Sequence, residues 1–310
     1  MHGSLAENSR GAIGFKRTSD DTPAILSNLI RPVAKSTITE LIPLSSRALP
    51  PSHARLHLLD EVRGFAVLCM VFFHAFYTMS MSFDMQAGTA LLDFFTPAEP
   101  FFAGLFILLS GFCCRLSRSN AKRGAILLCI ALALTATTLL LEWLGMQGTV
   151  IWFGILHLLS LGMLTFALAR PLLDRIHPVI GLLICILLFV LFYPISQGKI
   201  GLPGIFSVSL PDAFYQSDWL APLGMYSSSF YSADYFPLLP WLFLFLAGSF
   251  LGVAAQKEQC PRFFYRMHIR PLAFVGRHAL IVYIAHQPVI FVNFLLFTRQ
   301  KDLPRNILPL

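Results

Sequence analysis

Long apolar runs recur along the chain from about residue 57 onward, and short polar connections separate them. Each run is about 20 residues long, the length at which a helix crosses a hydrocarbon core of roughly 30 Å. The runs are too continuous for barrel strands, in which polar and apolar positions alternate. Backbone exposed to lipid must also be hydrogen-bonded internally, which favours helices. We predict transmembrane helices at about 57–80, 98–116, 124–143, 150–169, 178–195, 236–255 and 273–297.

The expected fold class is therefore all-α, a polytopic integral membrane helix bundle with about seven transmembrane helices. Two segments fall outside the pattern. Residues 1–54 mix Ser, Thr, Pro and charges of both signs without a period, so we expect a disordered N-terminal tail before a membrane domain over 55–310. Residues 197–235 are rich in Gly, Pro, Tyr and Asp and too polar to span, and we expect an extracytoplasmic loop able to cover a site.

The amino-acid composition agrees with a membrane protein and limits the classes of molecule that the protein is expected to bind. Hydrophobic residues make up 56% of the chain and charged residues 13%. Five of the six cysteines lie inside apolar runs, where they are expected to be small apolar side chains rather than disulfide or metal ligands. The net charge of +7 is concentrated in short connections and not on a basic face interleaved with aromatic residues. We therefore expect contact with the lipid bilayer and with phosphate groups, and no nucleic acid.

Basic residues alternate between the connections. Lys and Arg cluster between the second and third, fourth and fifth, and sixth and seventh predicted helices, whereas the other connections are acidic or carry at most one Lys. Cytoplasmic loops are the ones that carry an excess of Lys and Arg. The pattern predicts a cytoplasmic N-terminus and an extracytoplasmic C-terminus, although Arg299, Lys301 and Arg305 in the terminal segment disagree.

The first predicted helix carries ionisable residues that a membrane span does not readily accept. Arg63 and His74 are eleven residues apart, a rotation of about 1100°, which places them on one face and about 16 Å apart along the axis. Asp60 precedes Arg63 by three residues and can hold its guanidinium. The alternative is that Arg63 snorkels to the interface and His74 only bonds to a neighbouring helix.

Two further predicted spans carry a histidine at a similar depth. His157 lies in the outer half of the fourth helix, and His286 lies near the middle of the seventh beside Gln287. A single buried histidine is often structural, so that alternative stays open for each. Metal binding by the three imidazoles would need a further ligand at this depth, for which Glu99 and Glu142 are the candidates, and we expect no metal.

A second group of polar residues falls at the predicted cytoplasmic ends of the helices. These residues can form a phosphate-binding mouth, or they can be the topogenic charges that any such protein carries. The members are Arg63, Arg115, Arg118, Arg277 and His278.

With these residues placed, the chain resembles the transmembrane acyltransferase superfamily, and within it the bacterial relatives of the heparan-alpha-glucosaminide N-acetyltransferase catalytic domain. The resemblance covers about residues 55–297. It is carried by Leu59-Asp60-Glu61-Val62-Arg63-Gly64 leading to His74, by Phe106-Ile107-Leu108-Leu109-Ser110-Gly111-Phe112, by Ile151-Trp152-Phe153-Gly154-Ile155-Leu156-His157, and by Phe236-Pro237-Leu238-Leu239-Pro240-Trp241 together with Tyr283-Ile284-Ala285-His286-Gln287-Pro288.

The resemblance implies an acyltransferase of a bacterial cytoplasmic (inner) membrane. It would take acetyl-CoA or another acyl-CoA from the cytoplasm and modify an extracytoplasmic acceptor, a sugar, glycan or small molecule. Arg63, with Asp60 beside it, would orient the CoA arm or its phosphates, and His74 would be the general base or carry the acyl group. Apart from the resemblance, we hypothesise that His286 or Ser110 stabilises the oxyanion of the reaction.

Two other functions remain open. One is a transporter or lipid-moving protein whose buried charges line a polar path, for which the sequence shows neither inverted repeats nor matched broken helices. The other is a seven-helix sensor, for which the sequence offers no retinal lysine and no soluble signalling domain.

Overall fold

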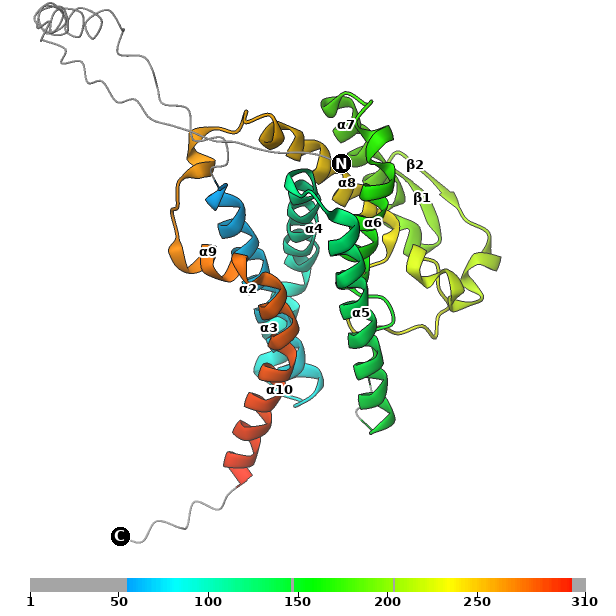
Figure 1. The fold of residues 1–310 in the computed structure, drawn as a ribbon. Coiled ribbons are helices and arrows are strands. Elements are labelled where there is room, and N and C mark those ends of the chain that lie inside the picture. Colours follow the sequence, from blue (N-terminus) through cyan, green and yellow to red (C-terminus); the bar gives the residue numbers. More distant parts are fainter. Residues whose placement is uncertain (1–54, 146–147, 203, 303–310) are drawn as a thin grey trace, which may run out of the picture. The chain divides into compact units, whose positions relative to one another are not determined.

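The computed structural model describes residues 55–145, 148–202 and 204–302, which belong to one compact unit, Ser52–Leu310 (Figure 1). The tail predicted over 1–54 lies outside the described residues.

Six described helices are long and apolar enough to cross a membrane, and a bent helix pair makes a seventh if it counts as one span. This confirms the polytopic helix bundle. The first and second spans are α2 (His57–Met81) and the run of α3 (Gln86–Phe95), η1 (Thr96–Ala98) and α4 (Glu99–Leu116). The next four are α5 (Asn120–Trp143), α6 (Ile155–Leu173), α7 (Pro178–Phe192) with η2 (Tyr193–Gln197), and α8 (Leu238–Gln256). The bent pair is α9 (Arg270–Arg277) with α10 (Ala279–Asp302).

Three elements differ from the sequence predictions. The seventh span is broken at His278, where α9 and α10 meet at 86°. Its first part, α9, is a short amphipathic helix with Pro271 as its second residue. This helix lies along α2 instead of continuing into α10. The fourth span begins at Ile155 rather than near 150, because Gly154 is extended. Helix α3 was not predicted, since it is short and lies in a segment expected to be a connection.

Two glycine contacts bring helix backbones together. A Cβ at Gly111 of α4 would collide with the Phe245 carbonyl of α8, and a Cβ at Gly248 of α8 would collide with the Leu108 carbonyl of α4. Gly64 of α2 and Gly276 of α9 form the same kind of reciprocal contact. Small residues let membrane helices approach this closely, so these positions fix how the helices register with one another.

Helix α4 lies between two groups of helices. In Figure 1, α2, α3, α9 and α10 lie on one side of α4 and α5–α8 on the other, and α4 contacts both α2 and α8. The core between them is filled by large buried side chains such as Phe166, Phe245 and Ile107. Helices α5 and α7 are mostly unburied along their apolar lengths, as expected for surfaces that face lipid.

The polar segment after α7 contains secondary structure of its own. Strands β1 (Lys199–Leu202) and β2 (Phe206–Ser209) pair antiparallel, with Lys199 opposite Ser209. Two short 3-10 helices follow, η3 (Asp212–Tyr215) and η4 (Asp218–Leu223). Among the described residues of this segment, none forms a helix long enough to cross a membrane. The segment leads to a buried residue, Asp234, just before α8.

Candidate active site

Two of the predicted histidines meet in the interior. The ring centroids of His74 on α2 and His286 on α10 are 4.9 Å apart. Both side chains are buried, at 8% and 7% exposure. The helices that carry them run in the same direction and are in contact (Figure 1). We refer to His74 and His286 as the histidine pair.

The hydrogen bond of His286 determines where its proton lies. Its Nδ1 faces the backbone carbonyl of Tyr283, and a carbonyl oxygen can only accept, so Nδ1 is the donor. In the neutral imidazole the lone pair is then on Nε2. This Nε2 is buried and has no hydrogen-bond partner among the residues described. His286 Nε2 is therefore a buried imidazole nitrogen that is able to accept a proton.

His74 has the complementary arrangement. The amide nitrogen of Gln287 lies 3.1 Å from Nδ1 of His74 and is oriented to donate to it. Because Nδ1 accepts, the proton of the neutral ring is on Nε2. The histidine pair therefore offers one imidazole lone pair and one imidazole N–H, the two functions needed to deprotonate a nucleophile and to stabilise an oxyanion.

A buried carboxylate lies next to the pair. The Tyr283 hydroxyl and the Ile155 backbone N–H both donate to Oδ2 of Asp234, the latter at 3.2 Å. A Cβ at Gly154 would collide with Asp234, so glycine is what admits the carboxylate to the start of α6. Burial raises the pKa of the Asp234 carboxyl above its ordinary value, and the hydrogen bonds from Tyr283 and Ile155 oppose that rise. The N-terminal end of α6 also favours a negative charge there.

Asp234 and Tyr283 were missed as site residues. Asp234 counted only as one of several acids in a polar loop, and Tyr283 only as part of a family segment. A usable signal was present, because Asp234 stands two residues before Phe236-Pro237, where the polar segment enters the membrane domain.

His157 has a different role from the pair. Its Nδ1 accepts from the Gly154 N–H at 3.2 Å, at the start of α6. Its Nε2 lies 3.3 Å from the Thr135 hydroxyl, which itself donates to the Ile151 carbonyl. Both ring nitrogens are thus satisfied by the protein, and the ring stacks on Phe153 at 5.4 Å between centroids. This arrangement fits the structural alternative for His157.

Glu99, the first residue of α4, lies close enough to Asp234 for the two carboxyl groups to interact electrostatically. Gln287 contacts His74 as described above. Within the described parts of the chain, no group of three His, Cys, Asp or Glu residues is arranged to hold a metal ion.

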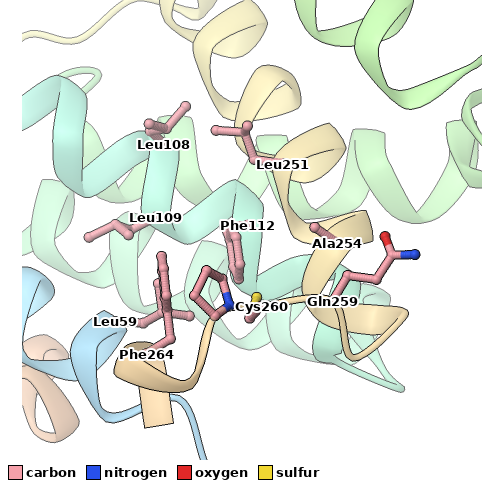
Figure 2. A pocket seen from close by; sticks show the side chains of 10 residues that line it. Leu59, Leu108, Leu109, Phe112, Leu251, Ala254, Gln259, Cys260 and Phe264 are labelled. Atoms are coloured by element: carbon pink, nitrogen blue, oxygen red, sulfur yellow. The ribbon is translucent and has the colours of Figure 1, made fainter. Parts of the chain in front are cut away.

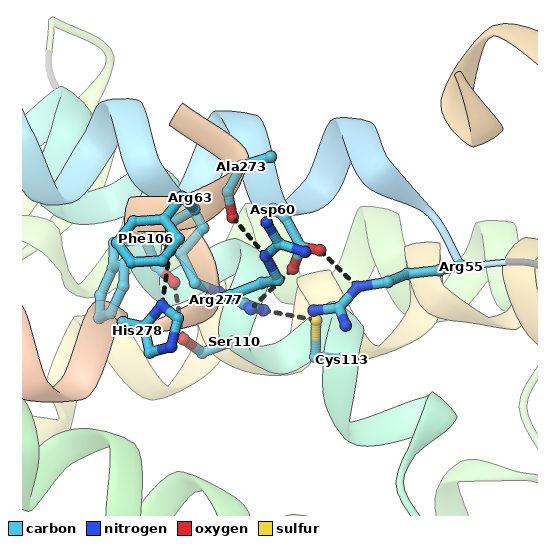
Figure 3. A network of polar contacts seen from close by, with 10 residues as sticks. Arg55, Asp60, Arg63, Phe106, Ser110, Cys113, Ala273, Arg277 and His278 are labelled. Carbon is cyan, nitrogen blue, oxygen red and sulfur yellow. Dashed lines mark hydrogen bonds and ion pairs between the residues drawn. The ribbon is translucent and has the colours of Figure 1, made fainter. Parts of the chain in front are cut away.

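Arg63 lies in a separate polar group, which Figure 3 shows. Its guanidinium is 3.8 Å from Asp60 and donates to the Cys113 sulfur at 2.7 Å. Asp60 also binds Arg55 at 2.6 Å. The predicted Asp60–Arg63 pair is present, and the structure adds Arg55 and Cys113 to it. We refer to Asp60, Arg63, Arg277 and His278 as the arginine group.

Arg277 and His278 lie at the break between α9 and α10, and Figure 3 shows them beside Asp60 and Arg63. The Arg277 Nε donates to the Ala273 carbonyl at 3.2 Å, and His278 Nδ1 donates to a carbonyl in the same helix. Both side chains are exposed, as is Arg118 beyond the end of α4. These residues remain accessible to a soluble anion.

Arg115 and Ser110 are placed elsewhere than the sequence suggested. Arg115 is buried, pairs with Asp174, donates to the Ser249 carbonyl at 3.0 Å, and packs over Phe166. Its guanidinium thus joins α4 to α6 and α8 and is directed away from solvent. Ser110 is drawn with the arginine group in Figure 3, and its hydroxyl donates to a carbonyl of its own helix at 2.8 Å. Among the described residues, no hydrogen bond or ring contact joins either side chain to the histidine pair.

An apolar cavity of about 320 Å³ opens near the start of α2 (Figure 2). It contains none of the predicted site residues. Its lining comes from α2, α4, α8 and the connection after α8, and consists of Leu59, Leu108, Leu109, Phe112, Leu251, Ala254, Gln259, Cys260, Pro261 and Phe264.

Comparison with known proteins gives one match. The family described as "Heparan-alpha-glucosaminide N-acetyltransferase, catalytic" matches residues 55–288, which include the histidine pair, Asp234 and the arginine group. No curated protein and no solved structure matches the chain.

Proposed function

Since the chain belongs to the heparan-alpha-glucosaminide N-acetyltransferase catalytic family, whose members use acetyl-CoA, we propose that it moves an acetyl group from cytoplasmic acetyl-CoA to an extracytoplasmic acceptor. The acceptor would be the amine or hydroxyl of a sugar or related small molecule. The observation that carries this proposal is the buried histidine pair, with an N–H on one ring and an unpartnered lone pair on the other among the described residues.

The chemistry follows from the two protonation states. His286 Nε2 accepts the proton of the acceptor amine or hydroxyl as that group attacks the thioester carbonyl. His74 Nε2–H donates a hydrogen bond to the oxyanion that forms. The intermediate collapses to the acetylated acceptor, and the CoA sulfur leaves and takes up the proton held by His286. These roles reverse the sequence-based hypothesis, in which His74 was the base and His286 steadied the oxyanion.

The arginine group would bind the phosphates of CoA. Arg63 and Arg277 bring two permanent positive charges against the single carboxylate of Asp60, and Arg277 is exposed. Guanidinium groups bind phosphate oxygens through paired N–H donors. Arg63 and His74 share a face of α2 and are separated by about 16 Å along its axis. A ligand bound at Arg63 would thus extend along α2 toward the histidine pair. The charge alternation of the connections supports a cytoplasmic position for the arginine group.

The rival proposal is a transporter or lipid-moving protein. Transporters often place broken helices at matched positions of two repeats. The bundle has one such break, between α9 and α10, and the helices described contain no second bent pair to match it. A base and a hydrogen-bond donor side by side in the interior suit the transfer of an acyl group better than the passage of a solute across the membrane.

Purified protein in sealed liposomes separates the two proposals. Radiolabelled acetyl-CoA is added outside and glucosamine is enclosed inside as the acceptor probe. We expect labelled N-acetylglucosamine inside and free CoA outside. His286→Ala and His74→Ala should lower the rate by about 10²–10⁴-fold, the usual contribution of a general acid or base. His177→Ala is the matched control, since His177 is exposed and its side chain makes no cap at the start of α7. Glucosamine release without acetylation would instead favour transport.

A further inference from the structure

The carboxylate of Asp234 reaches across three parts of the chain, and we propose that it is a positioning residue that holds His286 in its reactive orientation through Tyr283. This inference rests on the function proposed above. Asp234 touches neither member of the histidine pair by a hydrogen bond that the structure records, so its role differs from theirs.

The first step is the anchoring of Tyr283. The Tyr283 hydroxyl donates to Asp234, which lies 49 positions earlier in the sequence. The same carboxylate oxygen accepts from the Ile155 N–H, which belongs to the first turn of α6. Asp234 thus connects the end of the polar segment after α7, the start of α6 and the second turn of α10. Tyr283 is 5% exposed and has little freedom to rotate.

The second step runs from Tyr283 to His286. The Tyr283 carbonyl accepts the proton of His286 Nδ1, and the two rings are 5.2 Å apart between centroids. Because this bond places the proton on Nδ1, it leaves the lone pair on Nε2. The bond to Asp234 holds the Tyr283 ring against the His286 ring, and this packing keeps the imidazole turned toward the Tyr283 carbonyl. With the Tyr283 ring released, the imidazole would turn away from that carbonyl, and the proton would no longer be held on Nδ1. Asp234 therefore acts on the ring through the residue that fixes its tautomer.

The position requires a carboxylate for two reasons. Oδ2 accepts two hydrogen bonds in a buried place, and an amide would bring an NH₂ group that also needs partners. The negative charge also interacts favourably with an imidazolium formed at His286 when it takes the acceptor's proton. The ionisable groups that face His286 are His74 on α2, Tyr283 on α10 and Asp234. His157 on α6 and Glu99 on α4 lie near Asp234. Asp234 is thus the carboxylate that faces His286.

The test compares Asp234→Asn, Tyr283→Phe and the double variant with wild type in the liposome assay. Asp212→Asn is the matched control, because Asp212 is an exposed acid of the same segment. We expect each single variant to lower kcat by about 10²-fold with KM for acetyl-CoA changed by less than about threefold. The double variant should be no slower than either single one, because the two residues act in one chain of contacts. Additive losses, or a kcat near wild type in Asp234→Asn, would overturn the inference.

A second measurement requires no turnover and separates this inference from the proposed function. Nitrogen NMR of isotope-labelled histidine in detergent micelles distinguishes rings protonated at Nδ1 from rings protonated at Nε2, and His286→Ala assigns the signal. Wild type and Asp212→Asn should show the Nδ1–H form at His286, and Asp234→Asn should lose it. If wild type lacked acetyl transfer yet showed this change, the proposed function would fail and the positioning role would stand. An unchanged His286 signal in Asp234→Asn would refute the positioning role whatever the activity.

Discussion

Gly276 of α9 lies so close to Asp60 of α2 that a Cβ at position 276 would collide with the Asp60 carbonyl oxygen. Gly64 makes the reciprocal contact with the backbone of α9. His74 follows Gly64, and His286 follows Gly276, by the same ten residues. Because the chain bends by 86° between α9 and α10, the equal spacing does not by itself align the two rings. The glycine contact fixes α9 against α2 and so fixes where α10 begins.

Gly276→Ala should destabilise the protein and slow acetyl transfer. In an exposed helix, alanine in place of glycine stabilises by about 1 kcal/mol. Here the added methyl meets backbone that cannot move aside, and overpacking of this kind costs about 1–3 kcal/mol. Thermal unfolding in detergent and the liposome assay measure both effects. Gly104→Ala is the control, because a Cβ there meets only side chains of α8. An unfolding midpoint at or above wild type in Gly276→Ala would contradict the close contact.

Arg63→Ala should weaken acetyl-CoA binding and leave the fold intact. The guanidinium is partly exposed and its ion pair with Asp60 is long, at 3.8 Å, so little stability depends on it. Loss of one charge-assisted phosphate contact of about 1.5–3 kcal/mol should raise KM for acetyl-CoA by about tenfold to a hundredfold. Initial rates against acetyl-CoA concentration, with thermal unfolding as the control, test this. A normal KM would exclude Arg63 from the CoA site.

Arg115→Ala should destabilise the fold and leave acetyl-CoA binding nearly unchanged, the reverse of Arg63→Ala. This guanidinium is buried, pairs with Asp174 and packs over Phe166 and Phe250. Asp174 is half exposed, so water compensates part of the loss, and we expect a destabilisation of about 1–3 kcal/mol. The yield of folded protein and its unfolding midpoint should fall, while the KM of the surviving protein stays near wild type. A stable Arg115→Ala protein with a raised KM would return Arg115 to the CoA-binding mouth.

His157→Ala should cost stability without removing the chemistry. The ring accepts the Gly154 N–H at the start of α6 and bonds to Thr135, and loss of a helix cap costs about 0.5–2 kcal/mol. We expect a lower unfolding midpoint, with kcat reduced less than about tenfold, against at least about 10²-fold for His286→Ala. Equal losses of kcat in the two variants would show that His157 takes part in the reaction.

Ser110→Ala should leave the rate of acetyl transfer nearly unchanged. Its hydroxyl is satisfied by the Phe106 carbonyl of its own helix, and Figure 3 places it with the arginine group. Removing both the hydroxyl and its need for a partner is close to neutral in such a site. Liposome rates within about threefold of wild type would agree with this placement. A loss of kcat comparable to that of His74→Ala would make Ser110 an oxyanion partner after all.

The sequence alone determined the spanning architecture, because hydropathy and helix periodicity are local properties. The same locality made the Asp60–Arg63 pair predictable, since both residues lie on one helix three positions apart. It also identified His74 and His286 as polar side chains inside membrane spans, where insertion costs free energy and therefore indicates a role. Local patterns could not show that Glu61, next to Asp60, accepts the backbone N–H groups of His268 and Ile269 before α9.

Only the tertiary structure decided which of these residues meet. Arg63 and Arg115 look alike in sequence, yet one lies in a partly exposed group and the other is buried between helices. Asp234 joins Tyr283 and Ile155 across long stretches of chain, and His74 meets His286 rather than His157. These contacts depend on the depth and rotation of packed helices. Close backbone contacts at a few glycines and the break at His278 set that packing. These contacts join segments that are far apart in the sequence, and hydrophobic periodicity within one helix does not reveal them.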